Sequence, residues 1–207
     1  MSLDRARRIK VVLFDVDGVL TDGTIWFFPA AGSEVGATEV EREQHADSPG
    51  FGIMSRNMIE AKGFNAHDGT AISLARLGGL KTGMITKRIS ETVALRARDL
   101  QVDFLFQGAE NKSAVLDKIL DENALEAEQI AFVGDDVIDL PIMRRCGLAI
   151  AVANARPQVR AMAHYETPSS GGRGAARDAV EYILKAQGTL DRVIDAYLQA
   201  RTTIKRT

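Results

Sequence analysis

The sequence has a single cysteine, Cys146, among its 207 residues. One cysteine excludes an internal disulfide and a cysteine-rich metal site. The sequence also has no excess of positive charge: its formal net charge is −2 and its pI is about 6.0. No overall positive field therefore favours binding of nucleic acid. No apolar run is long enough for a signal-peptide core or a membrane span. We therefore expect a cytoplasmic protein without a nucleic-acid or membrane partner.

Apolar segments alternate along most of the chain with segments of helical periodicity. This alternation predicts βα units, and hence a parallel sheet in a single α/β domain over residues 1–207. We expect strands over residues 10–14, 82–86, 103–106, 129–134 and 148–152. We expect helices over about 69–79, 90–100, 111–122, 139–146 and 190–198, with Ser90 and Asn111 as N-cap residues of two of them.

Residues 18–68 interrupt this alternation. Trp26-Phe27-Phe28 and Gly63-Phe64-Asn65 predict the two strands of a protruding β-hairpin. The segment between them is long for a hairpin loop, and segments of this length are commonly functional lids or disordered. We therefore expect a flap inserted into the domain over about residues 18–68, with extra residues at about 30–60.

The most informative segment is VVLFDVDGVLTDG, residues 11–23. An apolar strand delivers Asp15 and Asp17 into a turn that Gly18 opens. Successive strand residues point to opposite faces, so these two carboxylates are expected to lean the same way. Such a pair can hold a hard cation and place one carboxylate against an electrophile.

Three further motifs follow later strands. They are Thr86 with Arg88, Lys112 behind Asn111, and GDDVID at residues 134–139. Each alone has an ordinary explanation as a surface turn, a helix cap or a solvated lysine. The three acids of the last motif, however, repel one another unless a positive group lies among them. Since open α/β sheets bind ligands at the carboxyl ends of their strands, the four motifs together predict one active site.

The chemistry that fits these motifs is hydrolysis of a phosphate monoester. Asp15 is the candidate nucleophile, and Asp17 can act as general acid to the leaving oxygen and then as base to water. A cation must screen the repulsion between the carboxylate and the phosphate dianion, and Mg²⁺ prefers oxygen ligands such as those of Asp15 and Asp135.

The remaining polar residues have supporting places in this scheme. The Thr86 hydroxyl and the Lys112 ammonium can hold the transferring phosphoryl oxygens. Asp136 and Asp139 are expected to support the metal ligands rather than to bind substrate.

The sequence resembles the haloacid dehalogenase superfamily through its DxDG segment, and it is similar within that superfamily to the 3-deoxy-D-manno-octulosonate 8-phosphate (KDO 8-phosphate) phosphatases of lipopolysaccharide synthesis. The narrower resemblance rests on several stretches of this sequence: DVDGVLTDG at 15–23, FNAHDG at 64–69, FQG at 106–108, NK at 111–112, VGDDVIDLP at 133–141, GGRGA at 171–175 and LKAQG at 184–188.

The resemblance implies a Rossmann-like three-layer fold with a β-hairpin flap and no separate cap domain. It implies an aspartyl-phosphate formed on Asp15, and Mg²⁺ held by the Asp15 side chain, the Asp17 backbone carbonyl and Asp135. Thr86 and Lys112 take the places of the family's second and third motifs. It also implies a homotetramer in which the flaps form a small barrel and a neighbouring subunit closes each active site.

Substrate contacts are expected from Arg88 and Arg173, and from two positions that depart from the family pattern. The family's Thr-Gly-Arg reads Thr86-Lys87-Arg88 here, and the arginine often found before Asp-Gly is His67. Together with the long flap, these departures lie where the substrate is chosen and leave the hydrolytic residues intact.

Two alternatives to a KDO 8-phosphate phosphatase stay open. One keeps the reaction and changes the substrate to a nonulosonate 9-phosphate or another acidic sugar phosphate. The other is a catalytically weak tetrameric partner of a sugar cytidylyltransferase. A binding module need not keep Asp15, Asp17, Thr86, Lys112 and Asp135 together, which disfavours the second alternative.

Overall fold

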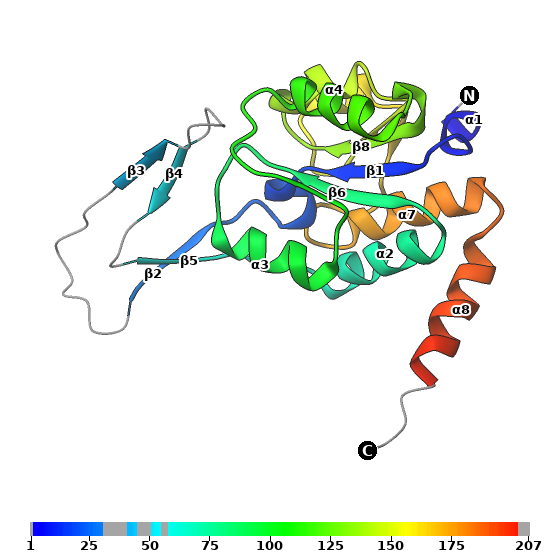
Figure 1. Cartoon of the computed structure of the whole chain (residues 1–207), viewed down its shortest axis with the longest axis horizontal. Helices are drawn as coiled ribbons and strands as arrows, with labels where there is room; N and C mark the ends of the chain where they lie inside the picture. The colour runs from blue at the N-terminus through cyan, green and yellow to red at the C-terminus, as the bar shows by residue number, and fades with distance from the viewer. Residues whose placement is uncertain (1, 31–40, 45–50, 55–57, 203–207) are drawn as a thin grey trace.

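The computed structural model describes residues 2–30, 41–44, 51–54 and 58–202 (Figure 1). The expected extra flap residues at about 30–60 lie largely outside them.

A six-stranded sheet forms the centre of the molecule. Its order is β10-β9-β8-β1-β6-β7 and every neighbouring pair is parallel. The strands are β1 (Val11–Phe14), β6 (Lys81–Ile85), β7 (Phe104–Phe106), β8 (Ile130–Gly134), β9 (Leu148–Ala151) and β10 (Tyr165–Glu166). Strands β1, β8 and β9 are buried along their whole length, as apolar strands covered on both faces must be.

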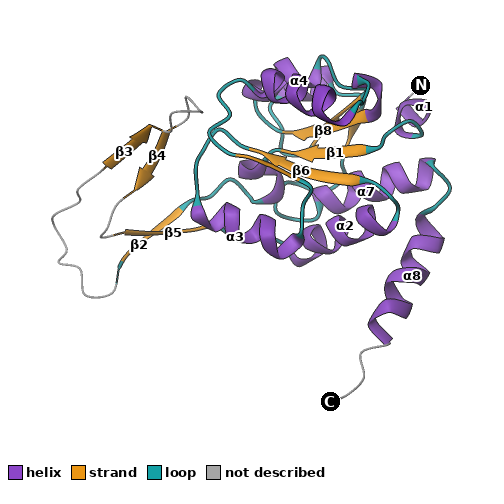
Figure 2. Cartoon of the chain, viewed as in Figure 1, coloured by secondary structure: helices purple, strands orange, loops and turns teal. Residues whose placement is uncertain are grey.

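Helices cover both faces of this sheet (Figure 2). Helices α2 (Ala66–Leu77), α3 (Glu91–Leu100) and α7 (Ala175–Ala186) lie on one face, and α4 (Lys112–Asn123) lies on the other, packed against α5 (Leu140–Met143). The shorter helices are α1 (Ser2–Ala6) and α6 (Pro157–Met162), and the last is α8 (Leu190–Thr202). The predicted α/β class and its three-layer Rossmann-like arrangement are confirmed.

The flap leaves the body as an antiparallel pair, β2 (Trp26–Pro29) and β5 (Met58–Ala61), in which Trp26 is opposite Ala61. We call this pair the flap stem. A second antiparallel pair, β3 (Glu41–Gln44) with β4 (Phe51–Met54), lies beyond it (Figure 1). A hairpin flap is therefore present, but the prediction that Gly63-Phe64-Asn65 forms its second strand is wrong.

The structure corrects two further local predictions. Helix α2 begins near residue 66 rather than 69, because the Asn65 side chain accepts a hydrogen bond from the His67 N–H at 2.8 Å and caps it. Asn111 and Ser90 are the N-cap residues of α4 and α3 as expected, although the Ser90 side chain makes no cap bond. Helix α7 lies outside the predicted helices, although its buried Ala176, Ala179, Val180 and Ile183 repeat at helical spacing.

Among the described helices, none combines the length and the apolar character that crossing a bilayer requires.

Candidate active site

The polar motifs meet at the carboxyl ends of the three central strands. Asp15 directly follows β1, Thr86 follows β6 and Asp135 follows β8, and these strands are neighbours in the sheet. Because parallel strands end at one edge, the residues that follow them are brought together. The expected juxtaposition of these motifs is present.

Asp15 is buried, and its Oδ1 accepts hydrogen bonds from the Val16 N–H at 2.7 Å and lies 2.8 Å from Nζ of Lys112. Lys112 also donates to Oδ1 of Asp139 at 2.6 Å, so one buried ammonium bridges two carboxylates. Burial, together with the nearby Asp139, raises the pKa of Asp15 to about 7 despite the opposing effect of Lys112. Burial alone would lower the pKa of Lys112, but the two carboxylates raise it.

Asp135 completes an acidic cluster that has the character of a cation site. Carboxylate oxygens of Asp15, Asp135 and Asp139 lie within 4.8 Å of one another. Burial and the charges of Asp15, Asp139 and Asp136 raise the pKa of Asp135 to about 7, and its Oδ1 is buried without a hydrogen-bond partner. A buried, unpaired carboxylate oxygen beside other carboxylates fits a hard divalent cation.

Asp139 differs from Asp15 and Asp135 because both of its carboxylate oxygens accept hydrogen bonds within the protein. Its Oδ1 is bound by Lys112, and its Oδ2 accepts from the Asp135 N–H at 3.0 Å and the Asp136 N–H at 3.4 Å. Both oxygens therefore already serve to orient the loop, which agrees with a supporting role. Asp136 is exposed and accepts from the Val137 N–H at 2.7 Å.

Asp17 is placed by a turn rather than by strand alternation. Strand β1 ends at Phe14, and Val16–Leu20 form one wide turn, non-helical at Asp17 and Gly18, which the Thr21 N–H closes by donating to the Val16 carbonyl at 3.0 Å. Gly18 occupies φ +95° in this turn, and a Cβ there would lie 2.2 Å from Oδ2 of Asp135. Only glycine combines this backbone angle with that close approach.

A lysine that the sequence motifs do not indicate reaches Asp17 from the flap. Nζ of Lys62 lies 2.5 Å from Oδ1 of Asp17, and the Lys62 side chain has 0% exposure. The two residues are 45 positions apart, and Lys62 stands just after β5. The short Asp-x-Asp-Gly spacing contains no signal for this contact.

The candidate residues line a hollow of about 210 Å³. Its lining includes Asp15, Asp17, Thr86, Asp135 and Asp136, with two of the predicted substrate contacts, Lys87 and Arg88. His67 and Arg173 are exposed and are not part of this lining. Lys112 and Asp139 are buried and do not line the hollow either, but Lys112 contacts Asp15, which does. The structure thus brings the predicted hydrolytic residues together and leaves the predicted substrate contacts His67 and Arg173 outside the hollow.

The loop that carries Arg173 is nevertheless packed tightly on the turn after Asp17. The Gly171 N–H donates to Oδ1 of Asn154 at 2.6 Å, and Asn154 Nδ2 donates to the Gly18 carbonyl at 3.4 Å. A Cβ on Gly171 would lie 1.7 Å from that carbonyl oxygen. Arg173 itself is 72% exposed and lies 3.8 Å from Asp22. Its backbone is fixed beside the site while its guanidinium faces outward.

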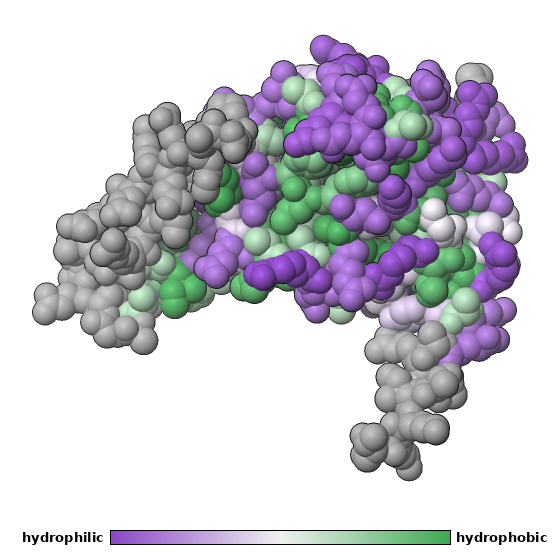
Figure 3. Space-filling view, viewed as in Figure 1, coloured by the Kyte–Doolittle hydropathy of each residue, from purple (hydrophilic) through white to green (hydrophobic). Residues whose placement is uncertain are grey.

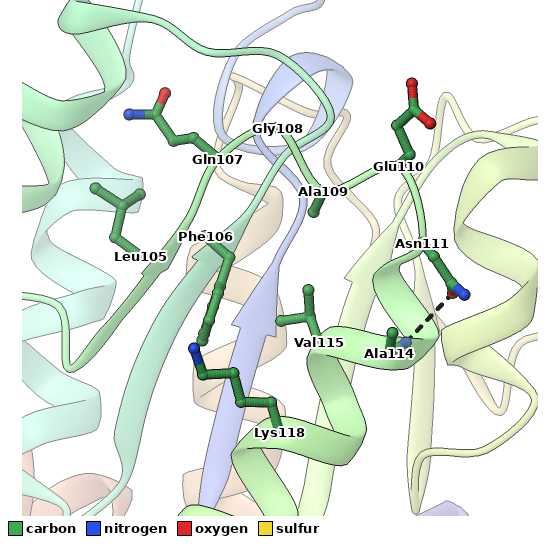
Figure 4. Close-up of a pocket in the computed structure, with 10 residues that line it drawn as sticks. All are labelled: Leu105, Phe106, Gln107, Gly108, Ala109, Glu110, Asn111, Ala114, Val115 and Lys118. Carbon is green, nitrogen blue, oxygen red and sulfur yellow. Dashed lines mark hydrogen bonds between the residues drawn. The ribbon is translucent and has the colours of Figure 1, made fainter. Parts of the chain in front are cut away.

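A second hollow, of about 460 Å³, lies between the end of β7 and the start of α4 (Figure 4). It is larger, but Glu110 and Lys118 are the only charged residues in its lining. Asn111 uses its side chain there to cap α4, accepting from the Ala114 N–H at 3.3 Å. The chemistry described above therefore belongs to the smaller, acidic hollow.

Comparison with known proteins places this arrangement among phosphatases. A family model described as haloacid dehalogenase-like hydrolase matches residues 85–177. The chain is 35% identical over 187 residues to 3-deoxy-D-manno-octulosonate 8-phosphate phosphatase of Escherichia coli (strain K12), with 90% of this chain and 85% of that protein covered.

Two solved structures resemble the whole chain. The first is a probable YrbI family phosphatase from Pseudomonas syringae pv. phaseolica 1448a, with 42% identity, a TM-score of 0.78, and coverage of 95% of this chain and 96% of the other. The second is 3-deoxy-D-manno-octulosonate 8-phosphate phosphatase from Moraxella catarrhalis in complex with magnesium, phosphate and KDO. It has 30% identity and a TM-score of 0.77, and the match covers 94% of this chain and 97% of the other.

Proposed function

This chain belongs to the haloacid dehalogenase-like hydrolases, in the group of KDO 8-phosphate phosphatases, and from that premise we propose that it hydrolyses KDO 8-phosphate to KDO and phosphate in the cytoplasm. Membership makes the protein a phosphoric monoester hydrolase. The observation that carries the proposal is the buried Asp15–Lys112–Asp139 bridge, in which Asp15 lines the acidic hollow together with Asp135.

In the first step, the Asp15 carboxylate attacks phosphorus, and the bond between phosphorus and the sugar oxygen breaks. Asp17 gives its proton to that oxygen, so the sugar leaves as a neutral alcohol. Asp15 becomes an aspartyl-phosphate. The Lys112 ammonium and the Thr86 hydroxyl stabilise the negative charge on the phosphoryl oxygens in the transition state.

In the second step, a water molecule attacks the phosphorus of the aspartyl-phosphate. The Asp17 carboxylate takes a proton from that water, the bond between phosphorus and the Asp15 oxygen breaks, and phosphate leaves. Both side chains return to their starting forms, so the net reaction consumes one phosphate ester and one water. Asp17 alternates between acid and base, as two successive displacements at phosphorus require.

We propose Mg²⁺ as the cofactor, held by the Asp15 and Asp135 carboxylates and the Asp17 backbone carbonyl. Its chemical contribution is to offset the charge repulsion between the substrate phosphate and Asp15. The Moraxella relative is described in complex with magnesium, and the unpaired buried Oδ1 of Asp135 supplies the oxygen that such an ion needs. Asp136 and Asp139 orient this part of the loop.

The acidic sugar is assigned to the basic side of the hollow. Lys87 and Arg88 line it, and either cation suits a substrate carboxylate. Arg173 and His67 are exposed and do not line the hollow of their own chain, so we propose that they contribute only across a subunit boundary.

We also propose that the enzyme is a homotetramer assembled through its flaps. Trp26, Phe27, Phe28 and Ile59 of the flap stem are 57%, 47%, 50% and 55% exposed. Hydrophobic surface is visible where the stem emerges beside the grey segment in Figure 3. Clustered exposed aromatic residues mark an interaction surface, and copies of the same stem provide a matching partner.

The deciding experiment measures phosphate release with Mg²⁺ from KDO 8-phosphate, a nonulosonate 9-phosphate and simple hexose phosphates. We expect a strong preference for KDO 8-phosphate in kcat/KM. The Asp15→Asn variant, with circular dichroism to verify its fold, should lose at least about 10⁴-fold in kcat because it lacks the nucleophile.

Three results would contradict the proposal in different ways. A preference for the 9-phosphate would change the substrate and keep the mechanism. Full activity of Asp15→Asn would remove the mechanism, and weak turnover of the entire panel would favour a partner module of a cytidylyltransferase.

A further inference from the structure

Lys62 has an unusual position for a lysine. It follows the last residue of β5 in the flap stem, and its side chain has 0% exposure. Lysine is almost never fully buried unless it is paired, because removing its charge from water is costly. A buried lysine at the base of a protruding flap is therefore expected to have negatively charged partners.

Two carboxylates are the partners of Lys62. Nζ of Lys62 is 2.5 Å from Oδ1 of Asp17 and 3.7 Å from Oε1 of Glu60. The contact with Asp17 is the shorter one, and Asp17 is the proposed acid and base of the reaction. The ion pair joins the flap to the residue on which proton transfer depends.

Glu60 is itself held by the body of the protein. Its Oε2 accepts from Arg88 at 3.0 Å, its Oε1 accepts from the Ser90 hydroxyl at 2.6 Å, and its backbone carbonyl accepts from the Thr92 hydroxyl at 3.1 Å. The hydroxyl expected to cap α3 is thus used to fix the flap stem. The hydrogen bonds from Ser90 and Arg88 lower the pKa of Glu60, although burial alone would raise it.

We propose that Lys62 is a positioning residue for proton transfer: by occupying Oδ1 of Asp17, it leaves Oδ2 as the oxygen that exchanges the proton with the leaving group and with water. The inference rests on the proposed function of Asp17. The inference gives the flap a second role: its base positions the residue that transfers the proton, while its stem is proposed to form the tetramer.

The test uses substituted phenyl phosphates, which have no carboxylate and differ in the basicity of their leaving group. General-acid assistance matters most for a basic leaving group, so its loss steepens the dependence of kcat/KM on leaving-group pKa. Asp17→Asn sets the reference slope. Lys62→Met, which keeps the length of the side chain and removes its charge, should steepen the slope in the same direction and lower kcat/KM for phenyl phosphate by about 10- to 100-fold.

Three companion variants make the result specific. Lys62→Arg should recover most of the activity and the shallower slope. Asp17→Asn combined with Lys62→Met should be hardly slower than Asp17→Asn alone, because a residue that acts through Asp17 has no effect once Asp17 is disabled. Lys118→Met, at an exposed lysine paired with Glu122, should match the wild type. If Lys62→Met does not fold, Lys62→Gln replaces it in each comparison.

Several outcomes would overturn the inference. Multiplicative losses in the double variant, or an unchanged slope in Lys62→Met, would show that Lys62 does not act through Asp17. A loss confined to KDO 8-phosphate would instead make Lys62 a ligand of the sugar carboxylate. None of these would affect the proposed function, which stands or falls with the substrate panel and the Asp15→Asn variant.

Discussion

The sheet edge carries Asp15, and the flap stem leads to Lys62, which contacts Asp17 of the same hollow, but different forces hold the edge and the stem in place. The edge follows strands β1 and β8, whose residues are fully buried. The stem exposes its aromatic residues and is tied to the body through Glu60 and Lys62. Hydrophobic packing thus supports Asp15, the proposed nucleophile, whereas a few polar contacts support Lys62, which we propose to position Asp17.

This contrast leads to a general expectation. Variants at the edge should change stability and activity together, because they disturb charges buried in the core. Variants in the stem should change activity with a smaller effect on stability, because their contacts lie between the core and a protruding segment. Three measurements test this difference between edge and stem.

The largest expected effect is that of Lys112→Met. This change leaves Asp15 and Asp139 buried without their shared cation, which costs about 3–5 kcal/mol in the free energy of unfolding. For a domain of this size that corresponds to a fall in Tm on the order of 10 °C. Differential scanning calorimetry measures the fall, with Lys118→Met as the control. A Tm equal to that of the wild type would refute the structural importance of the bridge.

The second effect is a pH-dependent stabilisation by Mg²⁺. Asp15 and Asp135 have pKa values of about 7 in the folded, metal-free protein against 3.8 as the ordinary value. The folded state therefore binds more protons than the unfolded state between these values, and the contribution of both groups to stability falls as pH rises from about 4 to about 7. Mg²⁺ needs the ionised carboxylates, so its stabilising effect should grow over the same window.

Thermal unfolding with EDTA and with MgCl₂, near pH 5 and near pH 8, checks this expectation. At a concentration about 100 times its Kd, Mg²⁺ adds about 2.7 kcal/mol, or about 5–10 °C in Tm at the higher pH. The shift should be much smaller near pH 5 and in Asp135→Asn. An equal shift at both pH values would contradict the assignment of the cation to these carboxylates.

The smallest expected effect is that of Glu60→Gln in the stem. Arg88 and Lys62 lose a carboxylate partner, but the amide still accepts hydrogen bonds, so Asp17 should be displaced only in part. We expect kcat/KM to fall by about tenfold while Tm changes by no more than a few degrees. Thr70→Ala, at a half-buried threonine outside the hollow, is the control. A loss of stability as large as that of Lys112→Met would contradict the expectation that stem variants affect stability less than edge variants.

The same contrast explains what could be predicted from the sequence. Asp15, Asp17 and the 134–139 loop are local motifs that follow apolar strands, so chain order and sheet geometry suffice to bring them together. Lys62 and Glu60 lie in a segment without such a motif. The predicted second flap strand at 63–65 is wrong because β5 is Met58–Ala61. With the strand misplaced, the sequence did not indicate that either residue lies beside the site.

Ser90 shows a second limit. A serine before a helix is normally assigned as an N-cap, and here its hydroxyl bonds Glu60, 30 residues away, instead. Local propensity cannot anticipate a competing partner that only the folded chain supplies. The single-domain organisation, the catalytic, metal-binding and substrate-binding roles of the site residues, and the tetramer stay predictions.

The central place of β1 also bears on how the protein is made. Val11 pairs with Lys81 on one side and with Ile130 on the other, so the ribosome must add about 120 residues after β1 before its second neighbour exists. Until then the nascent chain carries an apolar strand with an unpaired edge, and contacts over such long stretches of chain form slowly. The proposed nucleophile, Asp15, thus follows a strand that is translated before both of its neighbours, and its surroundings are complete only once β8 has been added.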